Sequence, residues 1–227
     1  MKSGIGLIVR EAQERYLERL LPPRDAIARE IEELAAAEDV PIADPEVARL
    51  LEIMARSTRA RTIVEVGTAI GYGALFLARG APEARVLTID RDAERLATAR
   101  RFLEKAGVAE RVELIEDDAL AALTRITGPI DLAWVDGEKK EYRRYLDLLL
   151  PQMSVGGTLL FDNLLWKGRV AEPPEEEEDD EATDALFAFN GYLMRHPQLA
   201  AVILPFGDGL GVATKTKPLI SELGGPF

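Results

Sequence analysis

The sequence contains no cysteine and a single histidine, His196. The lack of cysteine excludes disulfides, thiolate metal ligands and cysteine nucleophiles, and the single histidine excludes zinc sites that use several imidazoles. Any metal site in this chain must therefore be built from oxygen ligands.

Long apolar runs are also missing. No stretch approaches the roughly 18 uninterrupted apolar residues of a membrane-spanning helix, and the short apolar start at residues 4–9 is followed at once by Arg10 and Glu11. Neither a membrane span nor a secretory signal is indicated. We therefore expect a cytoplasmic protein that does not interact with membranes.

An excess of positive charge is missing as well, because the formal net charge is -12. Nucleic-acid binding depends on clustered Lys and Arg side chains, so the sequence favours a small-molecule partner over a nucleic acid. Much of the negative charge lies in EPPEEEEDDE at 172–181. We interpret residues 171–182 as a solvated acidic insertion that is placed to act as a flap.

The 227 residues, 47% of them hydrophobic, fit one domain over 1–227. Residues 1–60 are expected to form an N-terminal helical cap. Apolar residues at helical spacing in 11–37 predict two amphipathic helices separated at Pro22 and Pro23. A third helix is expected to begin at Asp44 and Pro45, with Asp44 as the N-cap residue. The apolar surface between Tyr16 and Leu34 suggests that these helices cover the active-site mouth and take part in a homodimer.

Residues 61–217 are expected to form a Rossmann-like α/β core. Five near-continuous apolar runs alternate with helical segments, which indicates a parallel, doubly wound sheet; they are residues 62–66, 85–90, 111–116, 132–136 and 157–162. Two further runs, 200–205 and 210–214, are separated by a connection too short for a parallel crossover. The sequence therefore predicts a mostly parallel seven-stranded sheet with an antiparallel C-terminal hairpin at one edge.

A glycine-rich turn, VEVGTAIGYG at 64–73, follows the first predicted strand. Its G-x-x-x-G-x-G spacing matches neither the dinucleotide fingerprint nor the phosphate loop, so a structural role and a ligand-binding role both remain open. Asp90 ends the second strand, where a carboxylate can accept both hydroxyl hydrogens of a ribose, which points to a nucleoside. Asp118, with Ala119, follows the third strand and either contacts an adenine edge or caps a helix.

Polar side chains also follow the fourth and fifth strands. Asp136 closes the fourth, and Asp162 with Asn163 closes the fifth. If these strands are neighbours, two carboxylates and one amide oxygen meet at the ligand-binding edge of the sheet. Such a hard-oxygen set suits Mg²⁺, Mn²⁺ or Ca²⁺, although carboxylates at strand ends also serve as caps or turn residues.

These motifs occur together and in a family-like order: VEVGTAIGYGALFLA, LTIDRD, EDDAL, LAWVDGEKKEYRRYL, GGTLLFDNLLWKGRV, the pair FN and ILPFGDGLGVATK. From about Tyr16 to Lys215 the chain resembles the cation-dependent O-methyltransferases, which include catechol and caffeoyl-CoA O-methyltransferases. The resemblance implies S-adenosylmethionine (SAM) as the cofactor, with Asp136, Asp162 and Asn163 as metal ligands. The implied cofactor-binding residues are Glu65, Gly67, Thr68, Gly71, Tyr72, Gly73, Asp90, Arg91, Asp118, Ala119 and Asp136. Gly73 departs from the family, which usually has serine there.

The implied reaction is methylation of one hydroxyl of a catechol-like vicinal diol. Lys139 matches the family's catalytic lysine and would accept the phenol proton, although a lysine there could instead pair with Glu138 or Asp162 at the surface. Trp166 could line an aromatic acceptor or serve in packing, and Asn190 of the FN pair could reach the acceptor. Two other hypotheses remain: a metal-free methyltransferase of the same fold acting on an amine or nucleobase, and a non-catalytic cofactor-binding module.

Overall fold

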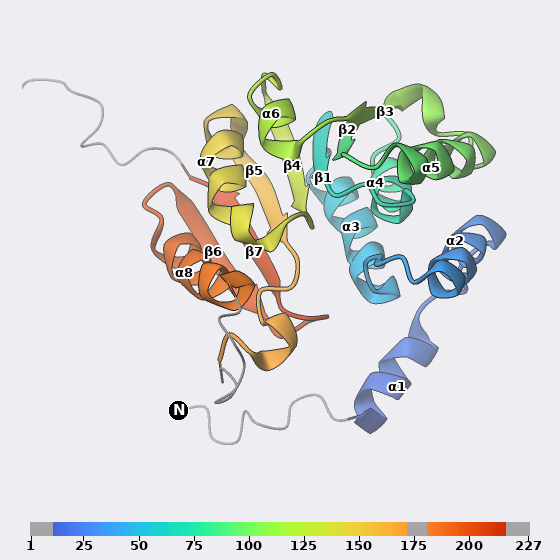
Figure 1. Cartoon of the computed structure of the whole chain (residues 1–227), viewed down its shortest axis with the longest axis horizontal. Coiled ribbons are helices and arrows are strands. Elements are labelled where there is room, and N and C mark those ends of the chain that lie inside the picture. Colours follow the sequence, from blue (N-terminus) through green and yellow to red (C-terminus); the bar gives the residue numbers. More distant parts are fainter. Residues whose placement is uncertain (1–10, 172–180, 217–227) are drawn as a thin grey trace, which may run out of the picture.

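The computed structural model describes residues 11–171 and 181–216, and within these ranges seven strands form one sheet with helices on both faces (Figure 1). The strands are β1 (Thr62–Val66), β2 (Arg85–Asp90), β3 (Val112–Glu116), β4 (Ile130–Val135), β5 (Met153–Phe161), β6 (Leu199–Leu204) and β7 (Leu210–Lys215). Their order is β3-β2-β1-β4-β5-β7-β6. Strands β1 to β5 pair in parallel, whereas β7 pairs antiparallel with both β5 and β6. The predicted fold class is confirmed.

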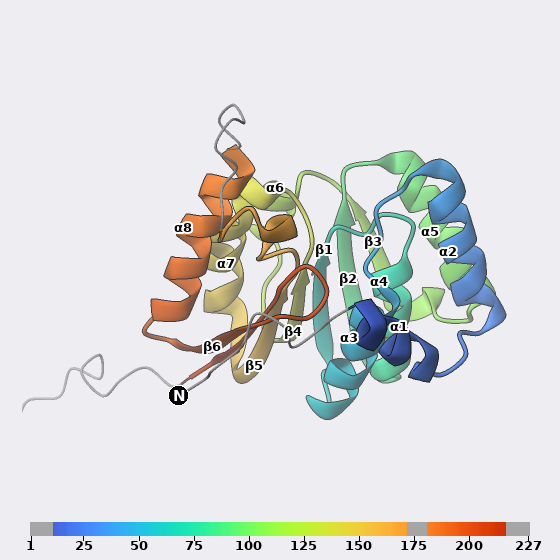
Figure 2. The same cartoon turned by 90° about the horizontal axis from the view of Figure 1, so that it is seen from below.

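The sheet is covered by a helical layer on each face (Figure 2). One face carries α2 (Ala26–Glu38), α3 (Pro45–Ser57), α4 (Tyr72–Gly80) and α5 (Ala93–Lys105), and the other carries α6 (Ala119–Leu123), α7 (Tyr142–Gln152) and α8 (Glu181–Arg195). Short 3-10 turns occur at Ala109–Arg111, Lys139–Glu141 and Trp166–Gly168. Among the described helices, none is long and apolar enough to cross a membrane.

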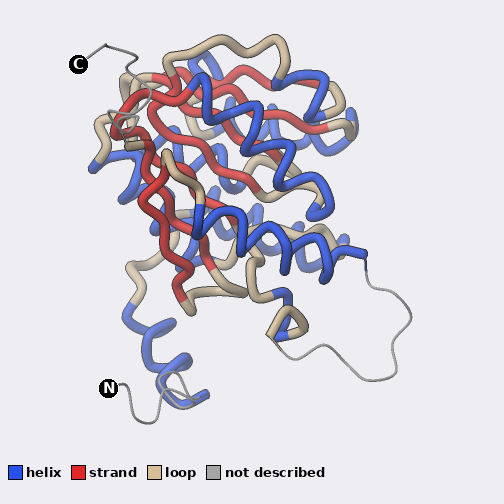
Figure 3. Tube along the Cα trace, turned by 90° about the vertical axis from the view of Figure 1, so that its left-hand side faces the viewer, coloured by secondary structure: helices blue, strands red, loops and turns tan. Residues whose placement is uncertain are grey.

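The N-terminal helices form where the sequence predicts them. Helix α1 (Glu11–Leu20) ends before Pro22, and α2 begins after Asp25, whose carboxylate accepts from Ile27 N at 3.0 Å and Ala28 N at 2.9 Å. Helix α1 projects away from the layers that cover the sheet (Figures 1 and 3). The apolar start at 4–9 and residues 172–180 of the acidic insertion lie outside the described residues.

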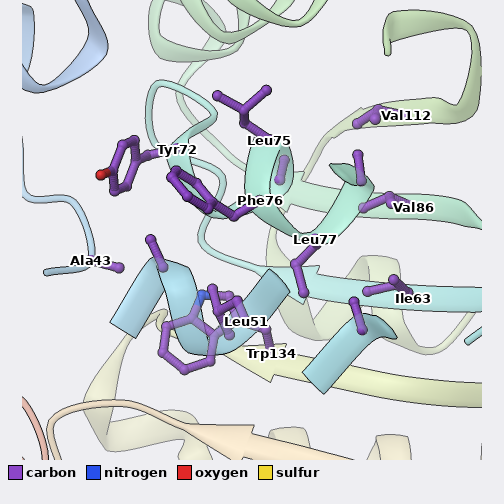
Figure 4. Packing of buried hydrophobic residues seen from close by; sticks show 14 of the residues in the cluster. Ala43, Leu51, Ile63, Tyr72, Leu75, Phe76, Leu77, Val86, Val112 and Trp134 are labelled. Atoms are coloured by element: carbon purple, nitrogen blue, oxygen red, sulfur yellow. The ribbon is translucent and has the colours of Figure 1, made fainter. Parts of the chain in front are cut away.

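One half of the core lies between the sheet and helices α3 and α4 (Figure 4). Leu75 and Leu77 of α4 are fully buried beside Ile63 of β1 and Val86 of β2. Trp134 of β4 is also buried, at 1% exposure, and belongs to the same part of the core. Burying each large apolar side chain contributes about 1.5–3 kcal/mol, so this packing holds the loop before α4 against the sheet.

The strand order reverses between β1 and β4. The chain runs outward from β1 to β2 and β3, and then returns to place β4 on the other side of β1. In open α/β sheets, ligands bind at the carboxyl edge where the strand order reverses. The loops after β1 and β4 carry Gly67 and Asp136, so these two sequence-predicted residues lie at that edge.

Candidate active site

The sequence-predicted residues gather at the carboxyl edge of the sheet. Glu65 lies in β1, Asp90 ends β2, and Asp118 follows β3 two residues after its last position. Asp136 follows β4 directly, and Asp162 follows β5 directly. Because β4 and β5 are parallel neighbours, the condition for a shared oxygen-ligand site at their ends is met.

The glycines of the turn after β1 are required by contacts within the protein. Gly67 has φ +98°, and a β-carbon there would lie 2.3 Å from the carbonyl oxygen of Asp136. Gly71 has φ +89°, and a β-carbon there would lie 3.0 Å from Cβ of Ala99 in α5. These glycines let loops pack closely, so the glycine spacing by itself does not point to a ligand.

Glu65, near the end of β1, says more about a possible ligand than the glycines do. It pairs in register with Thr88 on one side and Trp134 on the other, and it is fully buried. The Thr88 hydroxyl donates to Glu65 Oε2, and Thr68 Oγ1 lies 2.6 Å from Thr88 Oγ1. Burial, opposed by the Thr88 hydrogen bond and reinforced by Asp136 and Asp90, raises the pKa of Glu65 to about 8.

The second oxygen of Glu65, Oε1, is buried and has no hydrogen-bond partner among the described residues. Buried polar atoms in folded proteins are nearly always hydrogen-bonded, so such an oxygen beside the loop after β1 fits a site that binds a polar ligand. Helix α4 begins over this loop, and its N-cap residue, Gly71, has no side chain to cap the helix. The residues present are therefore compatible with a polar cofactor at this edge.

Asp90 is held in place by the backbone. Its Oδ2 accepts from Ala69 N at 2.8 Å, and its Oδ1 accepts from Asp92 N at 3.0 Å. A carboxylate oxygen can accept a further hydrogen bond, so the fixed carboxylate retains the capacity for the two ribose hydroxyls. Arg91 is exposed beside it.

Three of the sequence-predicted cofactor residues have structural roles of their own. The Tyr72 ring lies 5.0 Å from that of Phe76, and the Tyr72 hydroxyl donates to Glu32 of α2, so any ligand contact would come from its backbone (Figure 4). Asp118 is the N-cap of α6 and accepts from Ala121 N at 3.0 Å, which is the capping role left open by the sequence. Ala119 is the first residue of that helix.

The ends of β4 and β5 bring two carboxylates within electrostatic reach. Asp162 is 5% exposed, and its Oδ1 accepts from Asn163 N at 2.8 Å. Burial is the largest cause that raises the pKa of Asp162, and the negative charge of Asp136 is the next largest. Because a cation would relieve both effects, this pair fits a metal site.

The sequence-predicted donor set combines the two carboxylates with the amide of Asn163. Within the described ranges, no three His, Cys, Asp or Glu side chains are grouped so that they could hold a metal ion. Asn163 follows Asp162 directly and has φ +58°, a left-handed backbone conformation at the end of the strand. Two carboxylates with one amide oxygen form a hard-oxygen set that suits Mg²⁺, Mn²⁺ or Ca²⁺.

Lys139 lies at the same edge. Its Nζ is 2.7 Å from Asp136 Oδ1 and 3.0 Å from the Tyr142 hydroxyl, and its side chain is 12% exposed. The alternative of a surface lysine pairing with Glu138 or Asp162 is wrong, because Lys139 is mostly buried and its ion pair is with Asp136. The structure thus brings a primary amine to the two carboxylates.

Tyr142 and Tyr145 lie three residues apart at the start of α7. Both side chains are buried, but the Tyr142 hydroxyl also contacts Lys139. Burial is the largest cause that raises the pKa of Tyr142, and the negative charges of Asp136 and Asp162 raise it further. The three-residue spacing from Lys139 into the first turn of α7 was the one sequence signal that could have indicated this contact.

Trp166 and Asn190 lie near the loop that carries Asn163. Trp166 is partly buried at the start of a 3-10 turn and packs against the core cluster beneath α7 and α8. Asn190 Nδ2 donates to the carbonyl of Leu164 at 2.8 Å, so it ties α8 to this loop. Packing therefore accounts for the position of Trp166, and loop anchoring accounts for that of Asn190.

Comparison with known proteins identifies the family. Residues 26–216 match the model of the O-methyltransferase family. The chain is 32% identical over 179 residues to flavonoid 3',5'-methyltransferase of Vitis vinifera, a match that covers 74% of each chain. It is 30% identical over 220 residues to caffeoyl-CoA O-methyltransferase of Stellaria longipes, covering 90% of each.

A solved structure shares the fold. The O-methyltransferase TomG of Streptomyces achromogenes, which is involved in tomaymycin synthesis and was solved in complex with SAM, superposes with a TM-score of 0.80 at 27% identity. The match covers 90% of this chain and 96% of TomG. The chain therefore belongs to the O-methyltransferase family and is an enzyme of that class.

Proposed function

We propose that this enzyme transfers the methyl group of SAM to one hydroxyl of a catechol-like small molecule, with the help of a divalent cation. The observation that carries the proposal is the convergence of Asp136 and Asp162 at the ends of neighbouring strands, with Lys139 Nζ 2.7 Å from Asp136 Oδ1. The names of its relatives, a flavonoid and a caffeoyl-CoA methyltransferase, support an aromatic acceptor.

SAM would bind at the carboxyl edge between β1 and β4. In this proposal Glu65 and Gly67 lie near its methionine end, Asp90 near its ribose, and Asp118 with Ala119 near its adenine. The orphaned Glu65 Oε1, the fixed carboxylate of Asp90 and the SAM complex of TomG support this placement. When bound, SAM supplies a methyl carbon already activated by its sulfonium, so the task of the chain is alignment.

Asp136, Asp162 and Asn163 would hold the cation, Mg²⁺ or alternatively Mn²⁺ or Ca²⁺. When bound, the cation stabilises the negative charge that develops on the acceptor oxygen. Lys139 would accept the proton of that hydroxyl at Nζ. The methyl carbon would then bond to the oxygen as the bond between the methyl carbon and the sulfur of SAM breaks. The products are the methyl ether, S-adenosylhomocysteine and a protonated Lys139.

The proposal also includes a homodimer formed through the N-terminal helices. Tyr16, Leu17 and Leu20 of α1 are 55%, 55% and 60% exposed, and their spacing places them on one side of the helix. A cluster of exposed apolar side chains on a projecting helix is typical of an interaction surface. A second copy of the chain would bury it.

The test is methyl transfer from labelled SAM to catechol and caffeate, with and without EDTA. We expect chelation to abolish transfer and Mg²⁺, Mn²⁺ or Ca²⁺ to restore it. The double variant D162A/N163A should lose at least about 100-fold in kcat. D147N is the matched control, because Asp147 is an exposed carboxylate on α7 that accepts from Tyr192. Diol methylation that survives complete chelation contradicts metal dependence, and transfer to amines in EDTA would favour the metal-free alternative.

A further inference from the structure

The hydroxyl of Tyr142 connects the proposed base to the ends of two strands. It lies 3.0 Å from Lys139 Nζ, 3.2 Å from the carbonyl oxygen of Asp162 and 3.4 Å from the carbonyl oxygen of Val135. Val135 is the last residue of β4, and Asp162 follows β5. One side-chain oxygen therefore contacts both strand ends that carry the proposed metal ligands.

The direction of these hydrogen bonds is determined by chemistry. Carbonyl oxygens only accept and Lys139 Nζ donates to the Tyr142 hydroxyl, so the single hydroxyl hydrogen of Tyr142 goes to one of the two carbonyls, of which Asp162 O is nearer. The hydroxyl can then only accept from Lys139. Tyr142 is thus a fixed acceptor for the lysine amine, and its own hydrogen is engaged elsewhere.

Two fixed acceptors orient a tetrahedral nitrogen. Lys139 Nζ has three positions besides its carbon, and Asp136 Oδ1 and the Tyr142 hydroxyl accept from two of them. The direction of the third position then follows from tetrahedral geometry.

The Tyr142 ring is suited to this role because it is rigid. It is 1% exposed and lies 5.9 Å from the ring of Phe161 and 5.6 Å from that of Phe189. A lysine side chain has four rotatable bonds, and Asp136 alone would leave its amine free to turn about one hydrogen bond. The close-packed core around Tyr142 supplies a second, immobile partner.

We propose that Tyr142 is a positioning residue that holds the Lys139 amine in the direction required for contact with the acceptor hydroxyl. This inference rests on the proposed function, because it requires Lys139 to be the base. It assigns no proton transfer to Tyr142 itself. Removing its hydroxyl should slow the chemical step and leave cofactor and acceptor binding unchanged.

The kinetic test compares Y142F with K139M and the double variant. A catalytic group misplaced by about 1 Å can cost 10²-fold, so we expect Y142F to lower kcat by about 10- to 100-fold. KM for catechol and the Kd for S-adenosylhomocysteine, measured by calorimetry, should change less than about twofold. In the K139M background, Y142F should lower kcat by less than about twofold further. A loss that is the same in both backgrounds would overturn the proposal.

Y145F is the matched control. Tyr145 lies on the next turn of α7 with its ring 6.2 Å from that of Tyr142, but its hydroxyl donates to Glu141 and not to a carbonyl at the strand ends. We expect Y145F to retain the parental kcat. Thermal unfolding of all variants, with assays run below the lowest transition, separates instability from a slower chemical step.

A readout without turnover distinguishes failure of this inference from failure of the proposed function. In metal-free protein labelled with ¹⁵N-lysine, the side-chain N–H signal that K139M removes should be sharp in the parent and in Y145F. It should be broadened or lost in Y142F, because exchange with water accelerates when a buried hydrogen bond is removed. Its persistence in Y142F, or its absence from the parent, overturns the inference even if diols are methylated.

Discussion

A β-carbon on Gly73 would lie 2.1 Å from Glu65 Oε1, far inside contact distance. The buried carboxyl of Glu65 thus occupies the space that any side chain at position 73 would need. The position of Glu65 is therefore a physical reason for glycine at position 73 in this chain. Trp134 Nε1, 3.4 Å from the same point, closes the space from the other side.

The Gly73→Ala variant should be less stable than the parent, although alanine is the better helix former at this second position of α4. The added methyl must displace a buried carboxyl that Thr88 holds, and overpacking of this kind costs about 1–3 kcal/mol. Urea unfolding followed by circular dichroism measures the difference in the free energy of unfolding.

The control for this prediction is the same substitution in a Glu65→Ala background. There the space beside Gly73 is empty, so the cost of the added methyl should disappear or become a small gain. An equal cost in both backgrounds would show that Glu65 is not the obstacle.

Glu65 should make stability depend on pH. Its pKa is raised from 4.5 to about 8, so the folded state binds the proton more tightly than the unfolded state. Its contribution is fully present below pH 4.5 and is lost as the pH rises to about 8. Each pKa unit is worth about 1.4 kcal/mol, so the loss is on the order of a few kcal/mol.

Glu65→Gln, which is neutral at every pH, should remove this dependence. The difference in the free energy of unfolding between parent and variant should therefore favour the variant progressively from pH 4.5 to about pH 8 and stay constant above that. Urea titrations across this range measure it, and a difference that is independent of pH would contradict a protonated Glu65.

Asp131 should contribute to stability without affecting the site. Its Oδ2 accepts from Arg61 N at 2.8 Å and Thr62 N at 3.1 Å, and its Oδ1 accepts from Ser154 Oγ at 2.8 Å. These bonds tie the starts of β1, β4 and β5 together at the edge opposite the proposed site. Asp131→Ala should lower the free energy of unfolding by about 2–3 kcal/mol, with the KM of any acceptor unchanged.

The same carboxylate should add to acid sensitivity. Burial raises the pKa of Asp131, but the hydrogen bonds from Arg61, Ser154 and Thr62 outweigh it, so the pKa lies below its ordinary value. A depressed pKa contributes stability above the unfolded value of 3.8 that is lost as the pH falls through the folded pKa. Asp147→Ala, which removes an exposed carboxylate, is the control. Its free energy of unfolding should fall with decreasing pH as that of the parent does.

Introducing positive charge on the apolar side of α1 should dissociate the proposed dimer. Leu17→Lys with Leu20→Lys should give the 25.0 kDa mass of one chain in size-exclusion light scattering, whereas the parent should give twice that mass. Ile53→Lys is the matched control, because Ile53 of α3 is also an exposed apolar residue, at 50%. A parent that already elutes as a single chain would refute the dimer.

Much of the fold could be predicted from local patterns. Apolar runs such as residues 62–66 and 85–90 alternate with helical segments, and this rhythm determines a parallel sheet because crossover helices must cover both of its faces. The short connection between β6 and β7 requires an antiparallel hairpin for the same steric reason. Candidate carboxylates could be found because they directly follow buried strands.

What the sequence determined by itself is thus the rhythm of elements and the chemical types of the residues at the strand ends. Only the tertiary structure decided which side chains meet: that Lys139 pairs with Asp136, that Tyr142 contacts Lys139, and that Glu65 fills the space beside Gly73. Periodicity reports which face of an element is buried, whereas contacts across strands depend on register, rotamer and the packing of several distant segments at once. Apart from the three-residue spacing of Lys139 and Tyr142, those quantities have no local signature in the chain.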